Sequence, residues 1–358
     1  MLRYKEIKLQ LQDMISRIPA NEKLPSRAVL CKELDTTRST LAKAIRELEE
    51  EGLLVSRGGS GTYISAIIEN EAKLAGNWGV IVPNIMDSVY PGLVRGVENI
   101  AQGYGISVTL CNSDNDADKQ ERYIKRLMMS GVSGFIIVPV ITNSFAENYR
   151  LYQQLSDSRI PFVFCNRGVD GVDAPIITSN SYYGGYIAAK HLIQKGYKKI
   201  AFVAKQKYST SLERCHGYVS AITEAGLSIR NDYIIMNCEK SNNLWGYEEI
   251  KQLLQQADRP DAIFCFNDDV AHAAYRAITD LNLRISTDVG IIGYDNTDFC
   301  EMVTPAITSV AYKNIEIGEK AAEILRRMML DLTIPPFNYS LFQPEIIERE
   351  SCLGKGEC

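Results

Sequence analysis

From Trp78 onward, short runs of apolar residues alternate with longer stretches in which apolar positions recur at helical spacing. The short runs have the length of strands buried on both faces, and the longer stretches have the periodicity of amphipathic helices. Alternation of this kind predicts a doubly wound α/β structure built on parallel strands. The predicted strands are Val80–Val82, Ile106–Leu110, Phe135–Val138, Phe162–Cys165, Ile200–Val203, Ile234–Met236, Ile263–Phe266 and Ile291–Ile292.

Helical patterns lie between most of these runs, for example at Leu93–Ala101, Ile187–Leu192 and Ala271–Leu281. Together the strands and helices fill a region that is too long for one such unit. We therefore expect two similar lobes.

The first 66 residues follow a different pattern. A scaffold helix is predicted from five apolar positions ahead of Pro19, two shorter helices follow, and Gly52 ends the second of them. Two short β runs then flank an Arg-Gly-Gly-Ser-Gly turn. Helix, turn, helix and a glycine-tipped ribbon predict a winged helix-turn-helix. The apolar positions are Ile7, Leu11, Met14, Ile15 and Ile18 in the scaffold helix, Val29, Leu30 and Leu34 in the next, and Leu41, Ile45 and Leu48 in the last.

The last of these helices opens on Thr37-Arg38-Ser39-Thr40, a hydroxyl-rich first turn that carries a cation. Side chains at such a helix start can enter a major groove, and its free amides can meet phosphate. Arg57 and the wing glycines allow a close approach to the DNA backbone or minor groove. The alternative is a small helical module with ordinary capping threonines. Cap, cation, helix stop and glycine wing in one order favour DNA binding.

The segment from Tyr4 to Ile64 resembles the GntR family of bacterial transcription factors. The shared motifs are Leu24-Pro25-Ser26, Thr37-Arg38-Ser39-Thr40, Glu51-Gly52-Leu53 and Gly59-Ser60-Gly61-Thr62. The resemblance implies DNA contacts at Ser26, Arg38, Ser39, Thr40, Gly59 and Gly61. The chain departs from the family at Ala28 and Ala42, where arginines are common. Arg27 and Lys43 are the candidates to replace those cations.

Composition changes this picture in one respect. The 358-residue chain has a net charge of −5, which by itself argues against a nucleic-acid binder. Residues 1–66, however, hold 11 Lys/Arg and 9 Asp/Glu, a net +2, and the remainder holds 28 and 35, a net −7. The acidity therefore belongs to the α/β part. Because the basic surplus is small, DNA affinity must come from the placement of cations and from dimerisation.

Nine cysteines are scattered without a CxxC pair, and the N-terminus has no apolar signal segment. Free thiols in a reducing compartment explain this better than disulfides or zinc. No stretch of 18 apolar residues is present. We expect a cytoplasmic protein.

Polar side chains follow the ends of successive predicted strands, where open α/β sheets bind ligands. They include Asp87 after the first strand, Asn166-Arg167 after the fourth, and Asp295 after the last. Amides, carboxylates and guanidinium groups bind sugar hydroxyls, and aromatic rings stack on sugar rings. The alternative is that Asn-Asp pairs act as caps and turns, and Asp268 is expected to be a helix cap. Their convergence at one edge favours a sugar site.

The segment from Gly79 to about Ser351 resembles the LacI/GalR regulators and the periplasmic sugar-binding proteins that share their fold. The resemblance rests on Val80-Ile81-Val82-Pro83, Gly184-Gly185-Tyr186, Phe264-Cys265-Phe266-Asn267-Asp268, Ile292-Gly293-Tyr294-Asp295 and Ile346-Ile347-Glu348. It implies effector contacts at Asp87, Val89, Tyr90, Asn166, Arg167, Arg214, Asn267, Asp295 and Tyr312, and Trp245 is added as a stacking ring. The family commonly has a second aromatic at Val89, aspartate at Asn166 and glutamine at Tyr312.

The expected organisation is a winged helix at 1–66, a linker at 67–77 and a two-lobed sensor at 78–351. Lobe one would comprise about 78–180 plus 309–335, and lobe two about 181–308 plus 336–351. The combination implies a DNA-binding regulator of the arabinose-repressor type, a homodimer released from operator DNA by a monosaccharide.

The alternatives are a response to a sugar phosphate, for which Lys205 and Lys207 are candidates, a response to a purine, an activator, and a cytosolic solute-binding module without DNA function. An enzyme is not expected, because the three histidines lie far apart and there is no GxSxG, P-loop or HExxH. No cofactor or metal site is expected, and no membrane association.

Overall fold

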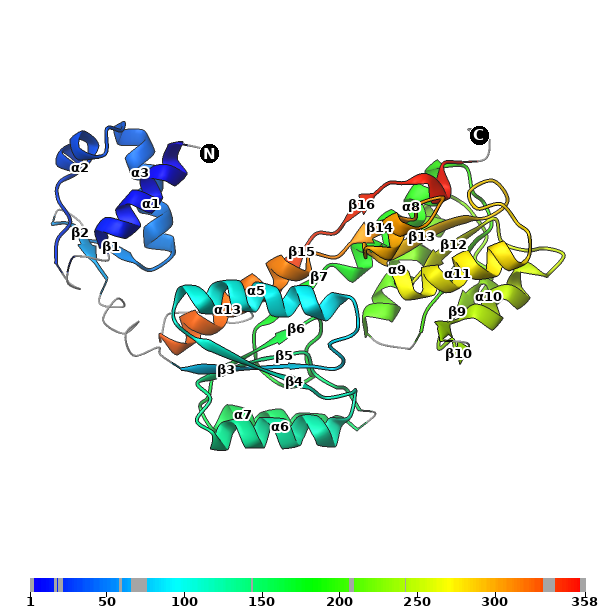
Figure 1. The fold of residues 1–358 in the computed structure, drawn as a ribbon, viewed down its shortest axis with the longest axis horizontal. Helices are drawn as coiled ribbons and strands as arrows, with labels where there is room; N and C mark the ends of the chain where they lie inside the picture. The colour runs from blue at the N-terminus through cyan, green and yellow to red at the C-terminus, as the bar shows by residue number, and fades with distance from the viewer. Residues whose placement is uncertain are drawn as a thin grey trace.

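The computed structural model describes residues 3–15, 18, 22–57, 60–65, 76–142, 144–205, 209–241, 243–330 and 339–354. Most of the predicted linker at 67–77 lies outside them, as do Gly59 and Lys207. The described part contains a small helical unit at the N-terminus and two α/β lobes (Figure 1).

The N-terminal unit has three helices and a two-stranded antiparallel sheet, as predicted for a winged helix. The helices α1, α2 and α3 bury one shared apolar cluster that includes Leu11, Leu30 and Leu41. The backbone of Glu22–Leu24 also pairs with β2, through Leu24 N to Thr62 O at 2.9 Å and Ile64 N to Glu22 O at 2.8 Å. The elements are α1 (Arg3–Ile15), α2 (Arg27–Glu33), α3 (Arg38–Glu50), β1 (Leu54–Arg57) and β2 (Gly61–Ile64).

Lobe one is a six-stranded parallel sheet in the order β15-β7-β6-β5-β3-β4, with helices on both faces. The helices α5 and α13 cover one face, and α6 and α7 cover the other (Figure 1). The elements are β3 (Asn77–Val82), α5 (Val89–Gly103), β4 (Ser107–Asn112), α6 (Ala117–Met129), β5 (Gly134–Ile137), α7 (Phe145–Asp157), β6 (Phe162–Cys165), β7 (Ile176–Ser179), α13 (Asn314–Met329) and β15 (Tyr339–Phe342).

Lobe two repeats the plan with the strand order β16-β14-β13-β12-β8-β9, in which only β16 is antiparallel. The helices α8 and α9 pack on one face, and α10 and α11 on the other. The elements are α8 (Ser181–Gln194), β8 (Ile200–Val203), α9 (Ser209–Glu224), β9 (Ile234–Ile235), β10 (Lys240–Ser241), β11 (Leu244–Trp245), α10 (Tyr247–Leu254), β12 (Ala262–Cys265), α11 (Asp268–Asp280), β13 (Gly290–Asp295), α12 (Phe299–Met302), β14 (Thr308–Ala311) and β16 (Glu345–Ile347).

The predicted lobe boundaries were wrong at two strands. The prediction placed residues from 309 onward in lobe one, but β14 pairs with β13 and β16 in lobe two. It also placed residues 336–351 in lobe two, but β15 pairs with β7 in lobe one. Both strands lie next to a crossing between the lobes, where the apolar pattern does not change. The chain crosses three times, after β7, after β14 and after β15.

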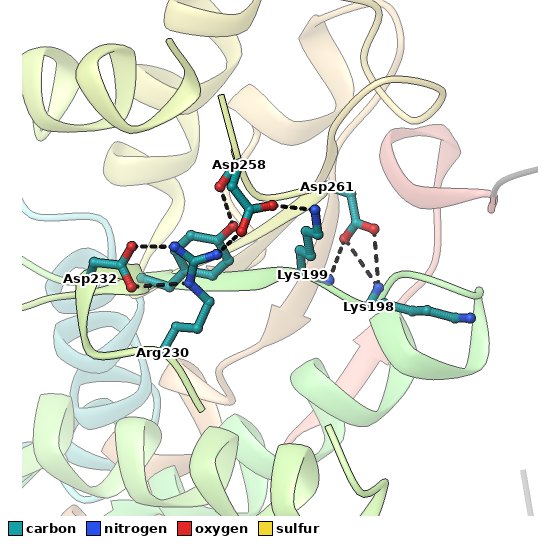
Figure 2. A network of polar contacts seen from close by, with 7 residues as sticks. Lys198, Lys199, Arg230, Asp232, Asp258 and Asp261 are labelled. Carbon is teal, nitrogen blue, oxygen red and sulfur yellow. Dashed lines mark hydrogen bonds and ion pairs between the residues drawn. The ribbon is translucent and has the colours of Figure 1, made fainter. Parts of the chain in front are cut away.

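Charged residues at the start of the lobe-two strands pair mainly with one another (Figure 2). The Asp261 carboxylate accepts from the backbone amides of Lys198 and Lys199, the latter at 2.8 Å. Arg230 lies between Asp232 and Asp258 and pairs with both. The parallel strands that start at this edge end at the opposite edge of the sheet. Open α/β sheets bind their ligands at that opposite edge, beyond the carboxyl ends of the strands.

Candidate functional site

The recognition helix α3 begins at Arg38, one residue after the predicted opening at Thr37. Thr37 caps it by accepting from the amide of Thr40 at 3.3 Å, and its hydroxyl also contacts those of Ser39 and Thr40. Arg38 and Ser39 are exposed. The hydroxyls of Ser39 and Thr40 contact the Thr37 cap, whereas the cationic side chain of Arg38 is exposed to solvent at the start of the helix.

The other predicted DNA-binding positions differ in their surroundings. Ser26 caps α2 by accepting from the amide of Val29, and Arg27 is the exposed first residue of that helix. The Lys43 ammonium lies 3.8 Å from the centre of the Tyr4 ring, and Arg57 stacks on Tyr63. A basic residue in such a position can contact phosphate, but the aromatic ring that it packs on fixes where its charged group points.

The wing is shaped by Gly61, whose φ of +125° favours glycine. A Cβ there would lie 2.4 Å from the side chain of Lys23, a cation that sequence reasoning missed. Lys23 pairs across the sheet with Tyr63 and is exposed. The feature of the sequence that could have identified Lys23 is its position immediately before the Leu24-Pro25-Ser26 motif.

All ten predicted effector residues line one cavity of about 400 Å³ between the lobes. They come from strand ends and the loops that follow them, because parallel strands end at one edge of each sheet. The ten are Asp87, Val89, Tyr90, Asn166, Arg167, Arg214, Trp245, Asn267, Asp295 and Tyr312.

Lobe one contributes hydrogen-bonding groups that are already oriented. The Asp87 carboxylate accepts a hydrogen bond from the Asn84 side chain at 2.8 Å. Burial raises the pKa of Asp87, and the charge of nearby Lys205 opposes this rise. Arg167 donates from Nε to the backbone oxygen of Pro139 at 2.7 Å. Held in this way, these groups can bind a ligand without first losing side-chain entropy.

Lobe two holds Arg214 between two aromatic rings. Its guanidinium carbon lies 3.4 Å from the centre of the Tyr294 ring and 4.5 Å from that of Phe266, and it donates to the Phe266 carbonyl at 2.5 Å. Gly185 makes room for this part of α9, because a Cβ there would lie 2.1 Å from the Arg214 carbonyl oxygen. Packing thus fixes Arg214 at the cavity wall.

Asp295 ends β13 with a φ of +105°, an unusual conformation for a non-glycine residue. One carboxylate oxygen accepts from the Ser88 hydroxyl of lobe one at 3.3 Å, and the other is buried without a hydrogen-bond partner among the described residues. Burial raises the pKa of Asp295 to about 8, against the opposing effect of Arg214. A buried carboxyl at the cavity wall with an open oxygen is suited to receive a ligand.

The predicted cap at Asp268 was wrong, because Asn267 caps α11 by accepting from the Val270 amide at 3.2 Å. Asp268 instead accepts from the Thr297 amide at 2.7 Å and from the Ser309 hydroxyl at 2.8 Å. It therefore positions the loop that follows Asp295. The helix begins one residue earlier than its acidic pair suggested, which turns Asp268 inward.

About half of the cavity lining was not among the predicted effector contacts. Lys205, which was named only as a candidate partner for a sugar phosphate, pairs with Asp269, and its ammonium lies 5.4 Å from the centre of the Trp245 ring. Lys240 and Asn243 come from the β10–β11 hairpin, which has no apolar run to reveal it. The other missed residues are Asn84, Ser88, Asn115, Thr210, Leu244, Phe266 and His272.

The described residues contain no group of three His, Cys, Asp or Glu side chains that could hold a metal ion. Within the same residues, no helix is long and apolar enough to cross a membrane.

These two sites, a winged helix with an exposed cation at its recognition-helix start and a polar cavity between two α/β lobes, define a ligand-sensing DNA-binding regulator. Two domain families match the chain: bacterial regulatory proteins of the gntR family over residues 3–64, and the periplasmic binding protein-like domain over residues 189–352.

Known transcriptional regulators are similar to this chain. The arabinose metabolism transcriptional repressor of Geobacillus stearothermophilus is 26% identical over 353 residues, which are 98% of this chain and 97% of that protein. The HTH-type transcriptional repressor PurR of Aliivibrio salmonicida is 32% identical over 277 residues, 76% of this chain and 80% of that protein. The structure of a LacI family regulator from Enterococcus faecium with bound ribose has a TM-score of 0.66 at 26% identity, and the match covers 77% of this chain and 98% of that one. The chain belongs to the bacterial transcriptional repressors that join a GntR DNA-binding domain to a LacI-type, periplasmic-binding-protein-like sensor.

Proposed function

We propose that this regulator is a homodimeric repressor that leaves its operator when a sugar-type effector closes the cavity between the lobes. The observation that carries the proposal is the convergence of ten predicted effector residues on one cavity. Carboxylates, amides, guanidinium groups and rings are the set that binds polyhydroxy ligands. The related regulator with bound ribose supports the same ligand class.

The proposed mechanism follows from where the polar contacts lie. Ser88 of lobe one reaches Asp295 of lobe two, and Tyr312 at the second crossing donates to Asn166 of lobe one at 2.6 Å. A ligand that contacts both walls binds the closed arrangement of the lobes more tightly than the open one. This difference in affinity is what shifts the equilibrium toward closure. In a dimer, closure changes the spacing of the two recognition helices, which must match half-sites about one DNA turn apart.

A titration of the full-length protein against the DNA upstream of its own gene tests this. Gel shifts should show a salt-sensitive complex of one dimer with one duplex. One member of a panel of monosaccharides, sugar phosphates, sugar acids and purines should dissociate it. A protein that binds the same ligand but keeps the DNA complex intact would contradict the release mechanism.

A purine is the second candidate effector, because PurR is among the more similar relatives. The Trp245 and Phe266 rings at the cavity wall could stack on a base as well as on a sugar. The purines in the panel separate the two cases: tighter binding of a purine than of every saccharide would favour this candidate.

We expect Arg167→Ala to weaken effector binding by about 2 kcal/mol, because it removes a charged hydrogen-bonding group from the cavity wall. Calorimetric titration measures the change. Arg150→Ala is the matched control, since Arg150 is exposed on α7 and its ion pair with Glu121 is 3.8 Å long. Equal affinities in the two variants would remove Arg167 from the binding site.

A further inference from the structure

The charges that line the cavity do not balance. The described lining holds four cations, Arg167, Lys205, Arg214 and Lys240, and three carboxyl groups, Asp87, Asp269 and Asp295. Lys205 is paired with Asp269, and burial raises the pKa of Asp295 to about 8, which favours its neutral form. Residues 67–358 as a whole carry a net charge of −7, so the positive excess is a property of the cavity and not of the sensor.

Arg214 is the most buried of these cations, with 4% of its surface exposed. Its guanidinium donates to the uncharged Phe266 carbonyl, and its Nε has no partner among the described residues. The Asp295 carboxyl is close enough for Arg214 to lower its pKa, but burial favours the neutral form of that carboxyl. Burial of a guanidinium group without an anion is costly. The two rings that sandwich it offset part of this cost, and an anion supplied by a ligand would offset more.

Asn166 adds a second donor near Arg214. Its side-chain oxygen is occupied by the Tyr312 hydroxyl, and its backbone oxygen by the Thr178 hydroxyl at 2.8 Å. The side-chain amide nitrogen is therefore the group that Asn166 can offer to the cavity. Burial raises the pKa of Tyr312, and Arg214 is the charged group that most opposes this rise. Arg214 and Asn166 thus both lie near Tyr312.

Two further carboxylates of the wall can act as acceptors. Asp87 and Asp269 are both close enough to Lys205 for their charges to interact. These carboxylates can accept hydrogen bonds from hydroxyl groups, as in other sugar sites. The wall therefore offers carboxylate acceptors near Lys205 in addition to the donors Arg214 and Asn166 near Tyr312.

We propose that the effector carries an anionic group, a carboxylate or a phosphate monoester, which lies against Arg214 and the side-chain amide of Asn166. Its hydroxyl groups donate to Asp87 and Asp269. The effector is then a sugar acid or a sugar phosphate rather than a neutral monosaccharide. This inference rests on the proposed function and specifies the ligand class of the same cavity.

Calorimetric titration of the full-length protein with matched ligands tests the inference. The neutral members are glucose, ribose and arabinose, and each is compared with its sugar acid and its terminal phosphate. We expect a charged member to bind at least about tenfold tighter than its neutral parent. The arms with sugar acids and sugar phosphates distinguish the two sources of negative charge.

Arg214→Gln should abolish this preference. Arg230→Gln is the matched control, because Arg230 lies on the same lobe, outside the cavity lining, between Asp232 and Asp258 (Figure 2). It should keep the preference of the parent protein. Circular dichroism confirms that both variants are folded.

A pH series on the unaltered protein gives a second readout that does not depend on a variant. A protonated Asp295 can donate to an anionic ligand, whereas its carboxylate would repel one. Affinity for the charged ligand should therefore fall as the pH rises through about 8. Lys205, Arg214, Asp268 and Asp269 are the charged groups that face Asp295, and Ser88 contacts it from lobe one. A neutral sugar that donates a hydroxyl to Asp295 would show the opposite slope.

The outcomes separate the two proposals. If a neutral sugar binds as tightly as its charged partners and releases the operator, the anionic group is refuted and the proposed function stands. If Arg214→Gln keeps a preference for the charged ligand, Arg214 is not its partner, and the inference fails. If no saccharide of either kind binds, both the inference and the sugar-responsive function are overturned.

Discussion

Replacing Arg38 with alanine should abolish specific operator binding while leaving effector binding unchanged. Arg38 is the first residue of α3, is exposed, and lies beside hydroxyls that are committed to the Thr37 cap. An arginine that reads a guanine contributes about 1–3 kcal/mol per contact. If the proposed dimer places one copy in each half-site, the loss is about 2–6 kcal/mol, or at least about 30-fold in affinity.

The measurement compares gel shifts on the operator and on a scrambled duplex of equal length. Binding to the scrambled duplex should change little, because it depends on phosphate contacts spread over the domain. Arg46→Ala is the control. Arg46 is exposed on the same helix but lies two turns from the end that enters the groove. An operator affinity that falls equally in both variants would show that Arg38 contributes charge but not base recognition.

The strands of the sensor could be predicted because burial on both faces produces unbroken apolar runs. Every predicted strand has a counterpart, from Val80–Val82 in β3 to Ile291–Ile292 in β13. The edge strand β15 escaped prediction because its residues alternate between exposed and half-buried. Its partner strand β7 has the apolar pair Ile176-Ile177, too short to be separated from a loop.

The cavity could be predicted for a topological reason: the carboxyl ends of parallel strands meet, so polar residues after separate strands converge. Contacts between distant segments could not be predicted in this way. The stacking of Lys43 on Tyr4 joins α3 to α1. The turn of Asp268 toward Thr297 and Ser309 depends on where a helix starts, and sequence patterns place such boundaries only to within a few residues.

The second large effect is expected from Gly185→Ala. Gly185 lies in α8, and a Cβ there would lie 2.1 Å from the Arg214 carbonyl oxygen and 2.7 Å from the Arg214 Cα. These are backbone atoms, so no rotamer change relieves the contact, and α8 and α9 must separate. Overpacking of this kind costs about 1–3 kcal/mol or more. Because α9 carries Arg214, its guanidinium should leave its place on the Tyr294 ring, and effector affinity should fall with stability.

Thermal unfolding and calorimetric titration measure the two consequences of Gly185→Ala. A loss of about 1–3 kcal/mol lowers the melting temperature of a domain of this size by several degrees. Gly103→Ala is the matched control, because Gly103 ends α5 and a Cβ there meets nothing within 4 Å. It should keep or slightly raise the melting temperature, since alanine is the better helix former. If Gly185→Ala lowers stability but keeps effector affinity, the α8–α9 contact supports the fold without positioning Arg214. The positioning role requires both to fall in Gly185→Ala and neither in Gly103→Ala.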